Sequence, residues 1–127
     1  MAVVLVVNDD RDTLATYHDV LESLGHVPVT KETIDSGPQT VLEVGADALL
    51  VDLQAPDEDQ FGLRIIEEVR SHPEVRNLPI ILATGAAAGI RNLRERLDPL
   101  DVPVLVKPFE IATLEESLRV VLEGRDA

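Results

Sequence analysis

The sequence predicts an α/β domain in which a five-stranded parallel sheet is covered by helices on both faces, the doubly wound arrangement. Short apolar runs alternate along the chain with longer stretches of helical periodicity. The runs are apolar at successive positions, so both faces of each strand must be buried, as in parallel sheets. Right-handed crossovers then place helices on both faces. With 127 residues and no linker or repeat, we expect residues 1–127 to form one domain.

Five segments are expected to be strands, because they are short and rich in β-branched or other apolar residues. The four clear segments are Val3–Val7, Ala48–Leu53, Pro79–Thr84 and Val102–Val106, and His26–Thr30 is a weaker one. Only three aromatic residues occur in the chain. The core that these strands form must therefore consist mainly of Val, Leu, Ile and Ala.

Apolar residues spaced by three and four predict a helix after each strand. In the first, Asp10 and Asp12 are expected to cap the N-terminus, and Gly25 stops the repeat. Ser36 followed by Gly37-Pro38 indicates the start of the second helix, with proline in its first turn. The other helical stripes are Leu63–Val69, Ile90–Leu97 and Ile111–Leu122.

Composition excludes several classes of function. A net charge of −13 repels phosphate backbones, so we expect no direct nucleic-acid partner. The absence of cysteine excludes disulfides, thiolate metal sites and cysteine nucleophiles, and fits a reducing compartment. No apolar run approaches the roughly 20 residues of a membrane span. The N-terminus shows no signal-peptide pattern, and we expect a cytoplasmic protein.

Polar side chains stand where four of the predicted strands end. In open parallel sheets the site lies outside the carboxyl ends of the strands. There the sequence places Asn8-Asp9-Asp10 after the first strand, Asp52 in the third, Thr84-Gly85 at the fourth and Lys107-Pro108 after the fifth. Two acids, a hydroxyl and a lysine are therefore expected to converge on one edge of the sheet.

Each of these residues also has a purely structural interpretation. Most acids lie at the surface, so Asp52 alone could be a solvated end of a strand, and Thr84 could be an ordinary strand residue. Lys107 is one of only two lysines beside nine arginines. Its stem could lie along the core while its ammonium reaches water. Jointly, the four positions favour a functional site at this edge of the sheet.

Four motifs carry a likeness to a known family: VVNDD, VDLQAPDEDQFG, PIILATG and VKPF. In this order and spacing, on five strand–helix units, they make the chain resemble the receiver domain of two-component response regulators over essentially its whole length. The resemblance implies a flavodoxin-like fold with strand order 2-1-3-4-5. It also implies a cis peptide bond between Lys107 and Pro108.

The resemblance also implies the roles of the site residues. Asp52 matches the phospho-accepting aspartate, Thr84 the hydroxyl donor to the phosphoryl group and Lys107 its ammonium partner. The implied cofactor is Mg2+, with Asp9, Asp52 and the backbone carbonyl of Gln54 as ligands and Asn8 acting through a water. A negative nucleophile approaching a negative phosphoryl group needs this charge neutralisation.

By the same resemblance, the chain accepts a phosphoryl group from a histidine kinase or phosphotransfer protein and switches protein–protein interactions. The resemblance therefore implies a signalling module that phosphorylates and dephosphorylates itself slowly, and not an enzyme with metabolic turnover. A phosphatase with an aspartate nucleophile usually has a second acid where Gln54 stands. A nucleotide-binding protein would need a glycine-rich loop after the first strand. The downstream partner and the oligomeric state stay open.

Three positions depart from the family. Asn8 replaces a carboxylate, Gln60 replaces the glycine of an Asp-Gly turn, and Val104 stands where the family often has a switch aromatic. Glutamine takes positive φ less readily than glycine. Val104 has no ring to move, so any signal must come from the loop 85–89 or the fourth helix. These departures leave a second interpretation open, a pseudo-receiver that binds proteins without phosphorylation.

Overall fold

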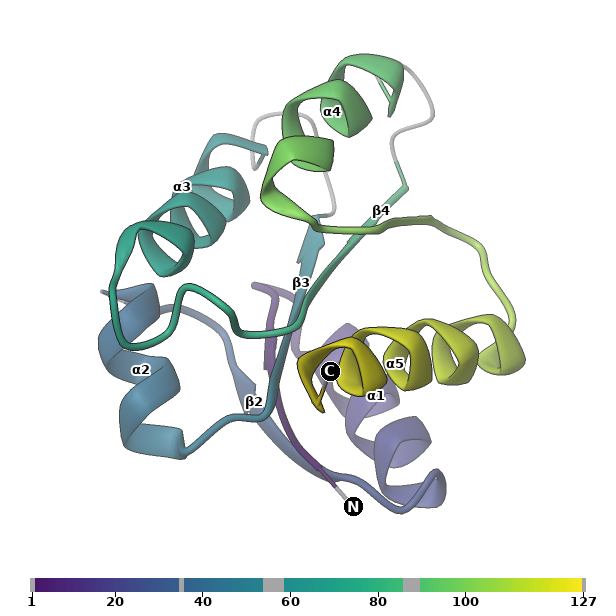
Figure 1. Cartoon of the computed structure of the whole chain (residues 1–127). Helices are drawn as coiled ribbons and strands as arrows, with labels where there is room; N and C mark the ends of the chain where they lie inside the picture. The colour runs from purple at the N-terminus through teal and green to yellow at the C-terminus, as the bar shows by residue number, and fades with distance from the viewer. Residues whose placement is uncertain (1, 35, 54–58, 86–89, 127) are drawn as a thin grey trace.

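The computed structural model describes residues 2–34, 36–53, 59–85 and 90–126. Strands and helices alternate along the chain, as predicted (Figure 1). In chain order the elements are β1 (Val3–Val7), α1 (Arg11–Ser23), β2 (Val27–Lys31), α2 (Gly37–Val44), β3 (Ala48–Leu53), α3 (Asp59–Ser71), β4 (Ile80–Thr84), α4 (Ile90–Leu97), the 3₁₀ turn η2 (Asp98–Leu100), β5 (Val104–Val106) and α5 (Ile111–Asp126).

The five strands form one parallel sheet in the order β2-β1-β3-β4-β5, which confirms the predicted order. β1 and β3 are inner strands, and Val7 pairs with Val51 near their carboxyl ends. Next along the sheet, Asp52 pairs with Ala83 of β4. The chain order reverses beside β1, so the carboxyl ends of β1 and β3 border the switch point where such sheets bind ligands.

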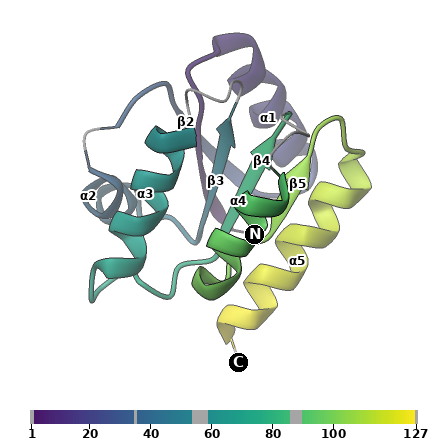
Figure 2. The same ribbon diagram turned by 90° about the horizontal axis from the view of Figure 1, so that it is seen from above.

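The core lies on both faces of the sheet. Figure 2, the view from above, shows α2 and α3 on one side of the sheet and α1 and α5 on the other. In each strand alternate residues pack on alternate faces. In β1, Leu5 and Val7 pack with the α2–α3 side, whereas Val4 and Val6 pack with α1 and α5. The described residues of the inner strands β1, β3 and β4 are therefore almost all buried, as their continuous apolar runs predict, whereas the edge strand β2 has no fully buried residue.

Two strands begin later than their apolar runs, because a proline precedes each. Pro79 and Pro103 have no N–H to donate to a neighbouring strand. Each contributes only its carbonyl, which accepts from Leu49 and Leu82 respectively. The N–H of Val102 instead donates to the carbonyl of Leu97, at the end of α4. The regular pairing of β5 therefore begins at Val104.

The helix ends follow the predicted signals. Asp10 is the N-cap of α1 and accepts the N–H of Asp12, which lies in the first turn. Ser36 caps α2 in the same way, by accepting from Gln39. Gly25 follows α1 with φ of 87°, a value that glycine adopts without strain. Local sequence therefore sets where α1 and α2 begin and end.

The acidic segment before α3 is only partly described. Asp57 and Glu58 lie outside the described residues, and Asp59 is the first residue of α3. Gln60 is thus already helical, and positive φ outside glycine occurs only at Asp101 among the described residues. Across the described ranges, no helix has the length and apolar character needed to cross a bilayer.

Candidate functional site

Asp52 lies at the centre of a polar cluster near the carboxyl end of β3. It lies two residues after Leu50, so both side chains point to the same face of the sheet, and Leu50 packs with α1 and α5. The two-residue period of the strand therefore directs the Asp52 side chain towards this face. That side chain has 0% exposure, although aspartate is normally a surface residue. Burial of a carboxylate is costly unless it is paired and hydrogen-bonded.

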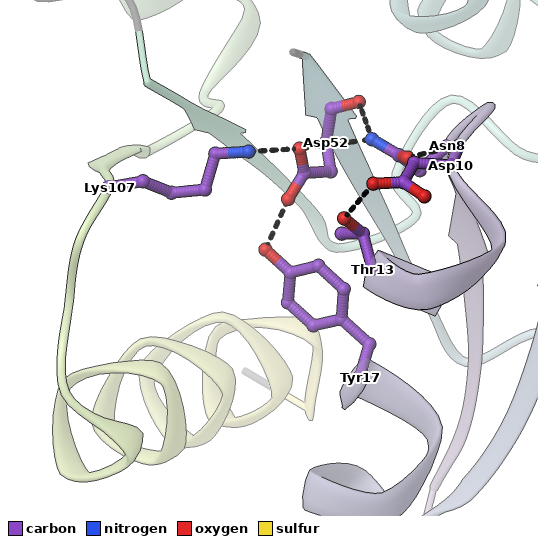
Figure 3. A network of polar contacts seen from close by, with 6 residues as sticks. All are labelled: Asn8, Asp10, Thr13, Tyr17, Asp52 and Lys107. Carbon is purple, nitrogen blue, oxygen red and sulfur yellow. Dashed lines mark hydrogen bonds and ion pairs between the residues drawn. The ribbon is translucent and has the colours of Figure 1, made fainter. Parts of the chain in front are cut away.

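Three side chains donate to the Asp52 carboxylate (Figure 3). The Lys107 ammonium lies 2.6 Å from Oδ1, and Asn8 Nδ2 donates to the same oxygen at 3.0 Å. The Tyr17 hydroxyl donates to Oδ2 at 2.5 Å. A carboxylate has about four lone-pair sites, so most of its accepting capacity is used. The pairing accounts for the burial of Asp52 and fixes the orientation of its carboxylate.

Asn8 connects this cluster to the start of α1. Its Nδ2 donates to the Asp52 backbone carbonyl at 2.8 Å as well as to Oδ1, and its Oδ1 accepts the Asp10 N–H at 2.7 Å. An aspartate at position 8 could not make the first two bonds, because a carboxylate has no proton to donate. Asn8 is also 3% exposed. The amide at this position therefore has a direct structural use.

Lys107 reaches Asp52 from the end of β5. Its backbone N–H donates to the Thr84 carbonyl at 2.8 Å, which continues the pairing of β4 with β5. The Lys107 side chain is 24% exposed, so it borders solvent while its ammonium holds Asp52. The Lys107–Pro108 peptide bond is cis, as predicted. Because its ammonium contacts Asp52, Lys107 is not simply a lysine at the end of a strand whose charge reaches water.

Thr84 and Gly85 lie at the end of β4, beside β3. Thr84 is 1% exposed and pairs in the sheet with Leu53, the residue after Asp52. A Cβ added to Gly85 would lie 3.8 Å from Lys107 Cε, an ordinary van der Waals distance. The structure therefore brings the ends of β3, β4 and β5 together, as the sequence predicts.

Tyr17 is the member of the cluster that sequence reasoning missed. It belongs to the buried stripe Leu14, Tyr17 and Leu21 of α1, and the pattern indicates only a core residue. Burial, together with the nearby charge of Asp52, holds the pKa of Tyr17 well above its usual range, so the phenol stays protonated. One signal was available: Tyr17 is the only side chain of that stripe with a hydroxyl.

The remaining predicted residues lie outside the hydrogen-bonded cluster. Asp9 is exposed and makes no hydrogen bond or ion pair with any described residue. Asp10 is used as the N-cap of α1, where its other carboxylate oxygen accepts from Thr13. Gln54, whose carbonyl was predicted as a metal ligand, lies outside the described residues. Val104 is half-buried on β5.

The side chains at this edge fit a small, hard cation. Two carboxylates, Asp9 and Asp52, and the amide of Asn8 offer oxygen ligands, the type that Mg2+ prefers. Within the described ranges, no three histidine, aspartate or glutamate side chains form a metal-binding group. In proteins, Mg2+ usually has only one or two carboxylate ligands and keeps several waters.

Comparisons with known proteins agree with this fold. The family model described as response regulator receiver domain matches residues 4–119. Chemotaxis protein CheY1 of Helicobacter pylori is 30% identical over 127 residues, with 96% of this chain and 98% of that protein covered.

Two solved structures are similar over almost the whole chain. A sensor protein from Polaromonas sp. JS666 has a TM-score of 0.76 and 27% identity, with 98% of each chain covered. A response regulator receiver domain protein from Clostridium thermocellum has a TM-score of 0.80 and 19% identity, with 99% of this chain and 98% of that chain covered, and supports the fold alone. Since the family model spans nearly every strand and helix described above, the chain belongs to the response regulator receiver domains of two-component signalling.

Proposed function

We propose that this receiver domain accepts a phosphoryl group on Asp52 from a histidine kinase or phosphotransfer protein, and thereby switches its affinity for a partner protein. The observation that carries the proposal is the buried Asp52 carboxylate with the Lys107 ammonium 2.6 Å from Oδ1. A buried acid between the ends of three strands is a poor choice for stability alone. It is well suited to a reaction in which charge on an acid must be balanced.

The transfer forms one bond and breaks one. An oxygen of Asp52 bonds to phosphorus while the P–N bond of the donor phosphohistidine breaks, and the bonding electron pair leaves with the imidazole nitrogen, which takes up a proton. Lys107 pairs with a phosphoryl oxygen once the Asp52 oxygen has become part of an acyl phosphate, and Thr84 donates its hydroxyl to another. Water later attacks phosphorus and releases inorganic phosphate and the free carboxylate.

Mg2+, when bound, offsets the negative charge of the phosphoryl oxygens. Asp9, Asp52 and the Gln54 carbonyl are the residues proposed to hold it, with Asn8 contacting it through a water. Because the chemistry requires mainly positioning and charge neutralisation, the protein needs no further nucleophile or base. Slow phosphorylation and slow autodephosphorylation are expected, rather than metabolic turnover.

The test is labelling with acetyl phosphate and Mg2+, followed by intact-mass spectrometry. The wild type should gain the mass of one phosphoryl group, and Asp52→Asn should gain none. Asp47→Asn is a matched control, because Asp47 lies at the other end of the sheet, where it accepts from the backbone N–H of Val3. An unlabelled wild type, or label that persists in Asp52→Asn, refutes the proposal. The comparisons do not favour the pseudo-receiver alternative, which predicts the unlabelled result.

A further inference from the structure

The Tyr17 hydroxyl occupies the Asp52 oxygen that Lys107 and Asn8 leave free. It donates to Oδ2 at 2.5 Å, whereas the other two donors both contact Oδ1 (Figure 3). Tyr17 is only 7% exposed, and it packs in the cluster formed by the sheet, α1 and α5. The phenol oxygen therefore reaches the carboxylate from a ring that neighbouring side chains hold in place.

Phosphorylation requires a change at this carboxylate. The Asp52 side chain has no exposed surface, and each of its oxygens already accepts at least one hydrogen bond. An oxygen that bonds to phosphorus loses most of its negative charge, so hydrogen bonds to it weaken. An interaction that is stronger in the ground state than in the transition state slows the reaction. At least one donor must therefore move or lose strength as the phosphoryl group enters.

The three donors differ in their ability to follow the charge. Lys107 is a flexible cation that is 24% exposed, so its ammonium can shift from Asp52 to a phosphoryl oxygen. Asn8 also donates to the Asp52 backbone carbonyl, a contact that the reaction leaves unchanged. Tyr17 has a single donor on a packed ring. Tyr17 is therefore the donor least able to follow the charge, and we expect its hydrogen bond to be the one that phosphorylation breaks.

We propose that Tyr17 is a positioning residue that holds unphosphorylated Asp52 through Oδ2 and thereby slows its phosphorylation. This inference rests on the proposed function. With acetyl phosphate, the Tyr17 hydroxyl releases Oδ2 and keeps its proton. An Asp52 oxygen then bonds to phosphorus, the P–O bond to the acetyl group breaks, and acetate leaves with the electron pair.

The composition of the chain supplies a direct probe of this contact. Tyr17 is the only tyrosine, and there is no tryptophan. Tyrosine emission depends on the hydrogen bond of the hydroxyl, so emission from the whole protein reports this one bond. Asp52→Asn should change the emission, because the negative acceptor becomes a neutral amide. Phosphorylation of the wild type should also change it, in step with the gain in mass.

The experiment compares phosphorylation of the wild type, Tyr17→Phe and Thr16→Ala by acetyl phosphate and Mg2+. Tyr17→Phe removes one oxygen and keeps the ring, so circular dichroism should be unchanged. Its labelling rate should rise about tenfold, the change expected on loss of one hydrogen bond to a charged group. Thr16→Ala should label at the wild-type rate, because Thr16 bonds only the Asp12 carbonyl on the exposed side of α1.

Each result decides the inference. Faster labelling of Tyr17→Phe, with wild-type emission that changes during labelling, supports it. Labelling of Tyr17→Phe at the wild-type rate or slower overturns it and leaves the proposed function standing. Wild-type emission that stays constant while the mass increases overturns it too, and this measurement needs no variant. If neither protein gains mass, the proposed function fails, and the restraint fails with it.

Discussion

The two ends of the parallel sheet use polar side chains in different ways. At the amino end, polar side chains bond to the backbone: His26 and Asp47 accept from the N–H groups of Ala2 and Val3. Arg70 likewise donates to main-chain carbonyls there. At the carboxyl end, polar side chains bond to one another, and Asp52 accepts from three of them.

The difference separates stabilising groups from groups available for chemistry. A side chain that pairs with the backbone satisfies a group that folding would otherwise leave unpaired, which is a structural task. A buried acid that is held by other side chains is different, because the acid and its partners could all be replaced by apolar residues without loss of stability. Arg70 and Asp52 are the clearest examples of the two kinds. Substitutions at the amino end should therefore affect stability alone, and those at the carboxyl end should affect both stability and phosphorylation.

The largest stability effect is expected for Lys107→Met, which keeps the apolar stem and removes the ammonium. It leaves the Asp52 charge buried without its cation, so the free energy of unfolding should fall by about 3 kcal/mol. Asp52→Asn should cost less, about 1 kcal/mol, because the Lys107 ammonium can turn to water. Urea unfolding followed by circular dichroism measures both.

The double variant Lys107→Met with Asp52→Asn is the control for this pair. It buries no unpaired charge, so it should be more stable than Lys107→Met alone. Equal losses in the two single variants would contradict the prediction, and would mean that solvent reaches Asp52 more readily than its 0% exposure indicates.

A smaller change in stability is expected for Asn8→Asp. Two hydrogen bonds to Asp52 disappear, and a second carboxylate comes close to Oδ1, where Asn8 Nδ2 now lies at 3.0 Å. Without Mg2+ the protein should lose about 2 kcal/mol of stability, since the bonds are lost and like charges repel. The affinity for Mg2+ should rise about tenfold, equivalent to about 1.4 kcal/mol. Calorimetric titration with Mg2+ measures the affinity directly.

Asn8→Ala is the matched control, because it loses the same hydrogen bonds without adding a charge. It should be destabilised and gain no affinity for Mg2+. Equal affinities of the wild type and Asn8→Asp would show that position 8 does not face the cation. Asp9 and Asp10 would then be the acidic pair, a result at odds with the use of Asp10 to cap α1.

The amino end supplies the third prediction, Arg70→Met. The guanidinium donates to the carbonyls of Leu78 and Leu100 at 2.6 and 2.7 Å and to that of Arg76 at 2.9 Å. Loss of these bonds should lower the free energy of unfolding by about 2 kcal/mol. Each hydrogen bond from a charged donor contributes to stability, but water can bond to the freed carbonyls and so offsets part of the loss. Phosphorylation of Asp52 should be unchanged. If Arg70→Met is still folded at the temperature of the assay and is nevertheless labelled more slowly than the wild type, the distinction between the two ends is wrong.

Arg70→Lys sharpens this test. A single ammonium cannot reproduce the planar fork that reaches three carbonyls. The lysine variant should therefore lie between the wild type and Arg70→Met in stability, although the charge is the same. A lysine variant as stable as the wild type would mean that charge alone, and not the geometry of the donors, holds these loops.

Much of the fold could be predicted because its signals are local. The runs Val3–Val7 and Ala48–Leu53 coincide with β1 and β3, since burial on both faces requires an unbroken apolar sequence. The predicted start of a strand was wrong where an apolar residue of the run belongs to another element. Val102 continues the run into β5, yet its N–H completes the end of α4. The sequence pattern indicates which residues are buried, but it does not specify which carbonyl accepts each N–H.

The site was predictable only in part. The topology of a parallel sheet indicates that Asn8, Asp52 and Lys107 meet, and the structure brings them together. Their roles in phosphorylation stay predictions. Tyr17 was missed because its contact with Asp52 joins a helix to a strand, and helical periodicity identifies only the buried face. The hydroxyl of Tyr17 was the one available signal, but it does not indicate which distant residue accepts from it.

The cluster around Asp52 also has a consequence for the order of folding. Its partners are distant in sequence: Asn8 by 44 residues, Tyr17 by 35 and Lys107 by 55. Contacts of such long range close only after the intervening chain has paid the entropy of loop closure. A chain without β5 in place has an aspartate that lacks its cation. The cluster is therefore complete only when α1, β3 and the end of β5 are all in place, and a nascent chain that still lacks β5 cannot form the pair between Lys107 and Asp52.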